Sequence, residues 1–266
     1  MSSSQASQSS QLFSLEGRHA LVTGGASGIG EATVKEFIRA GAFVWIADIK
    51  LTAAECLSQS LGSSQVLHLD VTSTQSIATA VSRLSRLDIL VNNAGIGHVG
   101  SIEQTEPDDF DRLINVNVRS VYLVTRAFLP LLLAAGGNVG PRLPVGSIVN
   151  IASVAGLVGI KQRFTYCTTK GAMVAMTRQL AVEYPKTLRV NAICPGTVET
   201  PFVEGYLEQF HKHNKEQIRA ELRARQPIGR LGRPDEVASM VRYLASEEAA
   251  FVSGSVLTID GGWTAA

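Results

Sequence analysis

Short apolar runs alternate with longer amphipathic stretches along this chain from residue 18 onward. The runs are continuous rather than alternating, which is typical of strands buried on both faces of a parallel sheet. Where a stretch such as 31–40 closes at Gly41, the pattern predicts a helix and its stop. The predicted strands are 19–23, 43–47, 66–69, 88–91, 147–152, 189–193 and 255–259, and the predicted helices are 31–40, 52–61, 73–84, 105–135, 165–184, 202–226 and 234–246.

Strands separated by helices of this size predict an α/β fold, a doubly wound parallel sheet with helices on both faces. The sequence contains no internal repeat and no break in composition, so residues 15–266 are predicted to form a single domain. The Ser/Gln-rich residues 1–14 are predicted to be a disordered tail. The Gly/Pro-rich stretch 136–144 is interpreted as a surface loop away from any chemistry.

Composition excludes several classes of protein. Of 266 residues, 45% are hydrophobic and 18% charged, and the net charge is +1, so neither disorder nor a nucleic-acid partner is expected. Cys56, Cys167 and Cys194 form no C-x-x-C pair, which predicts no metal site and favours a reducing, cytoplasmic location. No apolar run reaches the length of a membrane span, and the N-terminus has no signal-peptide pattern, so no membrane partner is expected.

A glycine-rich string lies between the first strand and the first helix, where backbone N–H groups can meet a pyrophosphate. Gly24, Gly28 and Gly30 have the spacing G-x-x-x-G-x-G, wider than the usual dinucleotide motif. The string alone is also compatible with a turn that merely uses glycine. Its position between strand and helix favours a dinucleotide site.

Two aspartates end the next two strands. A carboxylate at Asp48 can accept hydrogen bonds from ribose hydroxyls and would repel a 2′-phosphate, which favours NAD over NADP, although Lys50 softens this preference. Alternatively, Asp48 caps the following helix. Asp70 and Val71 lie where an adenine pocket is expected, with an ordinary Asp turn as the competing interpretation.

Tyr166 and Lys170 are four residues apart and therefore share one face of a predicted helix. A nearby ammonium is expected to lower the pKa of the phenol, so that Tyr166 can accept a proton from an alcohol. Ser153, just past the fifth strand, can hold the substrate oxygen. Each motif also has an ordinary explanation, a solvated helix face for Tyr166 and Lys170 and a turn for Ser153.

Together with Asn92–Gly95 and Pro195–Gly196, these motifs make the chain resemble the short-chain dehydrogenase/reductase family from Leu15 to Trp263. The resemblance implies a Rossmann-like seven-stranded sheet, a homotetramer and a Ser-Tyr-Lys mechanism. It also implies a helix asparagine in the proton relay, matched by Asn117, with Asn115 as the competing choice. The catalytic residues implied are Asn117, Ser153, Tyr166 and Lys170. The NAD-binding residues expected are Gly24, Ser27, Gly28, Ile29, Gly30, Asp48, Asp70, Val71, Asn93, Ala94, Gly95, Tyr166, Lys170, Pro195, Gly196, Val198 and Thr200.

The substrate is expected to lie over Tyr166, beneath a covering segment of about 200–227. Arg163 and Arg225 flank this region, and two guanidinium groups near a small pocket suggest a carboxylate, unless both are surface charges. The strings around both arginines also look like the cytosolic 3-hydroxybutyrate dehydrogenase-like branch, which is similar to 2-keto-3-deoxy-sugar-acid dehydrogenases. That branch implies NAD, and substrate contacts from Ser153, Arg163, Tyr166 and Arg225. His98 and Gln162 are further candidates for the pocket wall.

The leading interpretation is therefore an NAD-dependent dehydrogenase of a small hydroxy acid or sugar acid. A neutral sugar or polyol dehydrogenase would leave Arg163 and Arg225 unexplained. A 3-oxoacyl carrier-protein reductase normally uses NADPH, which Asp48 disfavours. A nucleotide-sensing protein without turnover would tolerate loss of Tyr166 or Lys170, and both are present.

Overall fold

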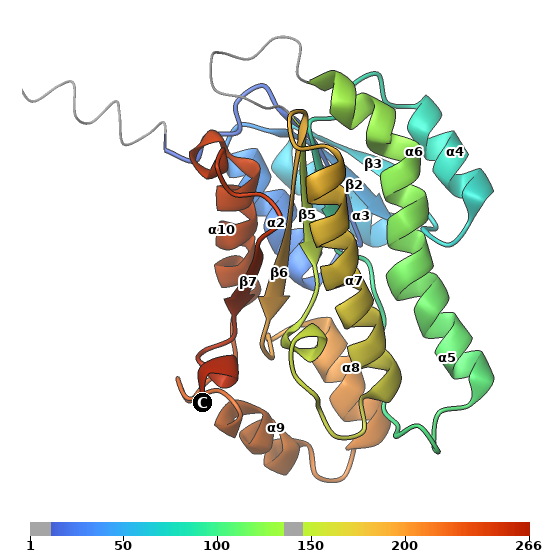
Figure 1. Ribbon diagram of the computed structural model, residues 1–266, viewed down its shortest axis with the longest axis vertical. Coiled ribbons are helices and arrows are strands. Elements are labelled where there is room, and N and C mark those ends of the chain that lie inside the picture. The colour runs from blue at the N-terminus through green and yellow to red at the C-terminus, as the bar shows by residue number, and fades with distance from the viewer. Residues whose placement is uncertain (1–11, 136–145) are drawn as a thin grey trace, which may run out of the picture.

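The computed structural model describes residues 12–135 and 146–266, so residues 1–11 of the predicted tail and the predicted loop over 136–144 lie outside these ranges. The last three residues of the predicted tail, 12–14, are described, and the Phe13 ring lies 5.8 Å from the Tyr243 ring, so the predicted disorder does not extend to them. Its seven strands form one parallel sheet in the order β3-β2-β1-β4-β5-β6-β7 (Figure 1). The strands are β1 (His19–Thr23), β2 (Phe43–Asp48), β3 (Ser64–His68), β4 (Ile89–Asn92), β5 (Gly146–Ile151), β6 (Leu188–Pro195) and β7 (Val256–Ile259). The predicted α/β, Rossmann-like doubly wound fold in a single domain is confirmed.

Helices cover both faces of the sheet. One face carries α2 (Gly28–Arg39), α3 (Leu51–Leu61) and α10 (Pro234–Ala245), which pack onto an apolar core that includes Val34, Phe37 and Val241. The other face carries α4 (Thr74–Ser82), α6 (Ser120–Ala134) and α7 (Phe164–Glu183) over a second core that includes Phe128 and Leu132. Short 3₁₀ turns are η3 (Val154–Gly156), η4 (Glu247–Ala249) and η5 (Trp263–Ala265).

The order of the strands reverses direction between β1 and β4, and such a reversal leaves a crevice at the carboxyl ends of the strands. The motifs singled out in the sequence all follow strands that end at this edge. The glycine turn follows β1, Asn93 follows β4, Ser153 follows β5, and Pro195 ends β6. The fold therefore brings together segments that lie as far apart in the chain as Gly24 and Pro195.

The long helix predicted over 105–135 is not continuous. It begins at Pro107 as α5 (Pro107–Ile114), passes through a π-helical turn, η1 (Asn115–Arg119), and continues as α6, with Pro130 inside α6. A π-turn inserts an extra residue into the helical ladder, a change that hydrophobic periodicity does not reveal. The predicted Asn117 lies within this turn.

The combined stretch Pro107–Ala134 has 28 residues and a mean hydropathy of 1.3 in its most apolar window, enough by length and composition to cross a membrane. This finding departs from the expectation that no apolar run reaches the length of a membrane span. Core helices pass the same test, and this one packs Val124, Phe128 and Leu132 into the core beside the sheet.

The polar stretch predicted as one helix over 202–226 forms two, α8 (Pro201–Phe210) and α9 (Lys215–Ala224), separated by a turn at 211–214. Both lie at the carboxyl edge of the sheet, next to the C-terminus (Figure 1). They are joined by a small apolar cluster of Val203, Leu207, Leu222 and Leu231. This pair of helices, the lid, covers the crevice.

Candidate active site

A pocket of about 510 Å³ lies at the carboxyl edge of the sheet, beneath the lid. Its lining includes most of the residues predicted from the sequence: Gly24, Ser27, Gly28, Ile29, Asn93, Ala94, Gly95, Ser153, Arg163, Tyr166, Lys170, Pro195, Gly196, Val198, Thr200 and Arg225. Five predicted residues do not line it, namely Gly30, Asp48, Asp70, Val71 and Asn117. His98 lines the pocket and Gln162 does not.

The glycine turn is shaped by two distinct requirements. Gly24 and Gly28 have φ of 62° and 58°, a left-handed conformation that favours glycine. At Gly30 the requirement is space, because a Cβ atom there would lie 2.6 Å from the side-chain nitrogen of Asn93. That Asn93 amide donates to the carbonyl oxygens of Thr23 (2.9 Å) and Gly24 (3.0 Å). Gly30 and Asn93 therefore fix the shape of the turn.

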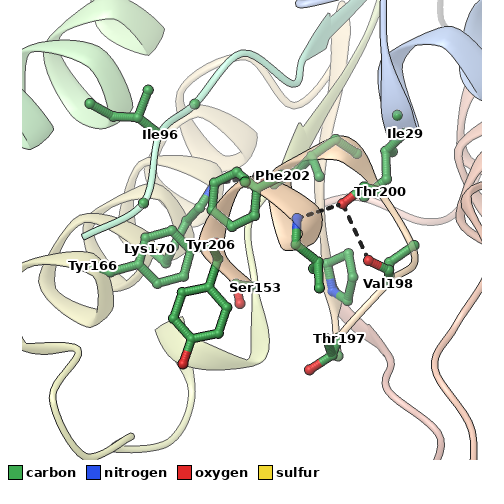
Figure 2. Close-up of a pocket in the computed structure, with 18 of the residues that line it drawn as sticks. Ile29, Ile96, Ser153, Tyr166, Lys170, Thr197, Val198, Thr200, Phe202 and Tyr206 are labelled. Carbon is green, nitrogen blue, oxygen red and sulfur yellow. Dashed lines mark hydrogen bonds between the residues drawn. The ribbon is translucent and has the colours of Figure 1, made fainter. Parts of the chain in front are cut away.

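The turn leads into the N-terminus of α2, where Ser27 is the N-cap residue and its side chain makes no capping hydrogen bond. The first N–H groups of a helix have no partners within the helix and attract anions. Ser27, Gly28 and Ile29 line the pocket opposite Val198 and Thr200, and Figure 2 shows Ile29 beside Thr200. A narrow glycine-lined turn with free N–H groups fits the pyrophosphate of a dinucleotide.

Asp48 is buried at the end of β2 and fastens the glycine turn. Its carboxylate accepts hydrogen bonds from the backbone N–H of Ala26 (3.0 Å) and of Lys50 (2.9 Å). The N-cap residue of α3 is Lys50, so Asp48 is not the cap of that helix. The carboxylate is held at the β2 end of the turn, beside the pocket rather than in its wall.

Asp70 forms a tight local turn after β3. Its carboxylate accepts from the backbone N–H and the hydroxyl of Thr72, at 2.9 and 2.7 Å, and these hydrogen bonds hold the pKa of Asp70 below its usual value. The Asp-turn interpretation thus describes its contacts here, and its role toward an adenine remains a prediction.

Ser153, Tyr166 and Lys170 meet on one side of the pocket (Figure 2). Ser153 precedes η3, its hydroxyl accepts from the Ala155 N–H at 3.1 Å, and it lies close enough to Tyr166 to lower the pKa of the phenol. Lys170, one turn after Tyr166 on α7, lies with its Nζ 5.8 Å from the centre of the Tyr166 ring and donates to the Ile151 carbonyl at 2.9 Å. The helical spacing predicted from the sequence therefore brings all three side chains together.

The pKa values of this cluster differ from the expectation. Burial raises the pKa of Tyr166 above its usual value, and the nearby Ser153 hydroxyl and Arg163 guanidinium only partly offset this. Burial also lowers the pKa of Lys170 to about 8. The predicted lowering of the phenol pKa by Lys170 is therefore not present in the protein alone, because removal from water penalises both charged forms.

Asn117 lies behind the pocket wall. Its side-chain oxygen accepts from the Ile96 N–H (2.9 Å), and its amide donates to the Ile96 carbonyl (2.8 Å) and the Thr169 hydroxyl (3.2 Å). A Cβ atom on Gly95 would lie 3.2 Å from the Asn117 oxygen and 3.8 Å from Lys170 Nζ. The side chain thus ties the helix to the loop after β4, close to Lys170.

Two arginines line the outer part of the pocket. Arg163 is half-buried and donates to the His98 carbonyl at 3.1 Å, and burial lowers its pKa, with a further lowering by Arg225. Arg225 is exposed at the rim, 5.8 Å from the Trp263 ring. Within residues 12–135 and 146–266, neither guanidinium has a carboxylate within salt-bridge distance.

The aromatic residues of the lid are site residues that the sequence-based prediction did not include. Phe202 lies with its ring centre 6.2 Å from that of Tyr166, and the Tyr206 ring lies 4.4 Å from the Arg163 guanidinium. Figure 2 shows both lid rings beside Tyr166. With Phe210 they recur every four residues, a helical periodicity that was a usable signal. Trp263, on the C-terminal turn, is the other aromatic lining residue.

Known proteins share this architecture and length. A family model described as enoyl-(acyl carrier protein) reductase matches residues 24–264. The chain is 38% identical over 252 residues to dehydrogenase/reductase SDR family member 6 of Rattus norvegicus, covering 94% of this chain and 98% of the relative. It is 36% identical to the 2-keto-3-deoxy-L-fuconate dehydrogenase of Xanthomonas campestris, covering 94% and 81%.

A solved structure agrees with these relatives. The ligand-free aldohexose dehydrogenase of Thermoplasma acidophilum superposes with a TM-score of 0.84 at 30% identity, covering 95% of this chain and 96% of that one. The matched region contains the glycine turn and the Ser153, Tyr166 and Lys170 cluster. The chain belongs to the short-chain dehydrogenase/reductase family and is an oxidoreductase of that family.

Proposed function

We propose that this protein is an NAD-dependent dehydrogenase that interconverts a secondary alcohol and a ketone in a small hydroxy acid or sugar acid. Bound NAD would supply the hydride acceptor for oxidation of the alcohol. Tyr166 takes the hydroxyl proton, Ser153 holds the substrate oxygen, and Lys170 offers its ammonium to the ribose hydroxyls and to the phenolate. This division of roles is supported by the position of the Ser153 hydroxyl beside Tyr166 and by the position of Lys170 one helical turn away.

The choice of NAD rests on Asp48. A carboxylate fastened at the end of β2 is close to the glycine turn, where the adenosine ribose of a dinucleotide would lie. Its negative charge favours ribose hydroxyls and opposes a 2′-phosphate. The neighbouring Lys50 weakens this preference without removing it, because its side chain carries the opposite charge.

The observation that carries the substrate class is the pair Arg163 and Arg225. Both guanidinium groups line the pocket that holds Tyr166, and neither forms an ion pair within the described chain. A half-buried cation is best stabilised by an anion, and guanidinium matches a carboxylate bidentately. A relative named for 2-keto-3-deoxy-L-fuconate also supports an acidic substrate.

The test is NAD⁺ reduction by the purified protein over a panel of hydroxy acids, sugar acids and their neutral amides or esters. Arg163→Ala and Arg225→Ala should each raise KM for the best acid by about 10- to 100-fold, the equivalent of roughly 1.5–3 kcal/mol for a charged hydrogen bond. The turnover number should fall less, because the carboxylate is held alike in ground and transition states.

Arg223→Ala is a matched control, since Arg223 is exposed on the same lid helix and does not line the pocket. It should leave KM unchanged. If the wild type oxidises the neutral analogue as well as the acid, the carboxylate assignment is wrong.

A neutral sugar dehydrogenase is the second candidate, favoured by the structural similarity to an aldohexose dehydrogenase. The same panel distinguishes the acid dehydrogenase from the neutral sugar dehydrogenase. In a neutral sugar dehydrogenase, Arg163→Ala would not raise KM for acids more than KM for neutral substrates. A 3-oxoacyl carrier-protein reductase normally uses NADPH, so a measured preference for NAD, as expected from Asp48, would argue against that function. A nucleotide sensor would show cofactor binding without turnover of any alcohol in the panel.

A further inference from the structure

Helix α8 of the lid has two apolar faces with different surroundings. Val203 and Leu207 are buried and pack against Leu222 and Leu231, which joins α8 to α9. Phe202, Tyr206 and Phe210 lie on another face, at i, i+4 and i+8, and all three line the pocket. We call these three residues the aromatic stripe. Tyr206 also packs against the cluster that joins the lid helices, whereas Phe202 and Phe210 do not belong to that cluster.

The aromatic stripe is exposed toward the cavity. Phe202 and Phe210 are 48% and 43% exposed. Exposed apolar side chains that form a contiguous patch often mark a surface that another molecule covers. Phe202 approaches so closely that a Cβ on Gly97 would lie 2.7 Å from its ring. The stripe therefore contacts the pocket wall at Gly97 through Phe202, and Phe210 at its other end is exposed.

The stripe runs alongside the reacting groups. Its first ring faces Tyr166 at 6.2 Å, and its second faces the Arg163 guanidinium at 4.4 Å. Successive rings are about 6 Å apart along the helix axis, from a rise of 1.5 Å per residue. A molecule that reaches from Tyr166 to Arg163 therefore lies against ring faces for most of that distance.

The polar groups around the stripe are largely engaged elsewhere. The Tyr206 hydroxyl is hydrogen-bonded to His211 at 2.7 Å, and the His98 ring lies 3.5 Å from Asp109. On the lid side of the described lining, Gln209 and Arg225 are the polar side chains with no hydrogen bond to the protein. These two side chains can serve one or two polar groups of a substrate, and the remaining hydroxyl groups along a sugar chain would lose water here without gaining partners, which is costly.

We propose that the aromatic stripe selects a hydroxy acid with an apolar body over a polyhydroxylated sugar acid of the same length. This inference rests on the proposed function, because it assumes an anion at Arg163. The stripe supplies ring faces to the carbon chain, and the Tyr206 ring at the same time holds the guanidinium in place by a cation–π contact. Selection then follows from burial of carbon atoms and from the absence of partners for extra hydroxyls.

The experiment compares acids matched in carbon number. Gluconate has six carbons and a hydroxyl at each of positions 2 to 6, whereas 2- and 3-hydroxyhexanoate have the same length with one hydroxyl each. The better hydroxyhexanoate should exceed gluconate in kcat/KM by at least about tenfold, from the cost of unpaired hydroxyls. It should also exceed the corresponding hydroxybutyrate by about tenfold, since each buried methylene contributes about fourfold.

The variant Phe202→Asn, Phe210→Asn removes two rings of the stripe. The hexanoate-to-butyrate ratio should fall to within about threefold of unity in this variant. Phe251→Asn, at a fully exposed phenylalanine outside the pocket lining, is the matched control and should keep the wild-type ratio. Each ratio is measured on one preparation, so it does not depend on the fraction of protein that is folded.

The outcomes are distinct. Equal kcat/KM for gluconate and hydroxyhexanoate would overturn the proposal and leave the acid dehydrogenase intact, as would an unchanged ratio in the double variant. Turnover of neutral analogues with no acid accepted would instead overturn the proposed function, and this inference with it.

Discussion

The Lys170 ammonium is among the most deeply buried charges of this pocket, and burial lowers its pKa to about 8. In the unfolded chain the same group titrates near 10.5. Between these values the unfolded state binds more protons than the folded state, so the contribution of Lys170 to the free energy of unfolding rises with pH. The group therefore weakens the fold at neutral pH, a cost that its position beside Tyr166 explains.

This linkage makes a prediction for Lys170→Met, which keeps an apolar side chain of similar length. Between pH 7.5 and 9.5 the wild type should gain about 2 kcal/mol in unfolding free energy relative to the variant, from ~1.4 kcal/mol per pH unit within the shifted window. Urea denaturation at equal protein concentration measures the difference. Parallel pH profiles of the two proteins would contradict a buried, charged Lys170.

Tyr166→Phe separates proton transfer from packing at a second residue. The variant keeps the ring beside Phe202 and removes the hydroxyl that lies near Ser153. Turnover should fall by at least ~10²-fold, as for other positioned acid–base groups. Binding of NAD, followed by fluorescence titration, should persist. Near-normal turnover in a purified variant would exclude Tyr166 as the base.

At the scale of elements, we expect the junction of β2 with α3 to decide the choice between NAD and NADP. The wild type should give a kcat/KM at least ~10-fold higher with NAD⁺ than with NADP⁺, the equivalent of one like-charge contact of about 1.4 kcal/mol. Asp48→Asn removes the charge and retains an oxygen that can accept from the Ala26 N–H, so the preference should shrink while the turn stays in place. Better use of NADP⁺ by the wild type would remove Asp48 from this role.

The predictable elements are those whose pattern is local. Buried strands can be recognised in the sequence as continuous apolar runs. Tyr166 and Lys170 lie on one face of α7 because about four residues make one helical turn. The boundaries and interruptions were less accessible. The break between α8 and α9 accompanies the packing of Leu207 against Leu222. The π-turn accompanies the hydrogen bond from the Ile96 N–H to Asn117. Both contacts join segments that are separate in the chain, so local periodicity does not reveal them.

The same distinction holds within the site. Glycines and the Ser-Tyr-Lys spacing could be identified in the sequence because the chemistry fixes them. The Tyr206 contact with Arg163 joins residues 43 positions apart and depends on the placement of the lid. The raised pKa of Tyr166 was likewise beyond the sequence, since burial outweighs its neighbouring cations only once the fold is formed.

At the scale of the whole molecule, helices α6 and α7 present apolar side chains on their outer surfaces. Tyr122 on α6 is 51% exposed and Val182 on α7 is 69% exposed, while Val121 and Val174 on the same helices are buried. Together with the assembly expected for the family, this predicts a homotetramer that covers these faces, with β7 forming another contact. Light scattering at micromolar concentration should give four times the 28.4 kDa chain mass, and a monomer would contradict it.

The π-turn at Asn115–Arg119 makes the length of this helix as important as its composition. One residue fewer would let the hydrogen-bond ladder close as a regular α-helix and would carry the preceding segment about 100° around the axis relative to α6. Asn117 would then turn away from Ile96, and the loop that lines the pocket would lose its anchor. We therefore expect a one-residue deletion within this turn to damage the pocket more than a conservative substitution there, although the deletion would make the helix more regular.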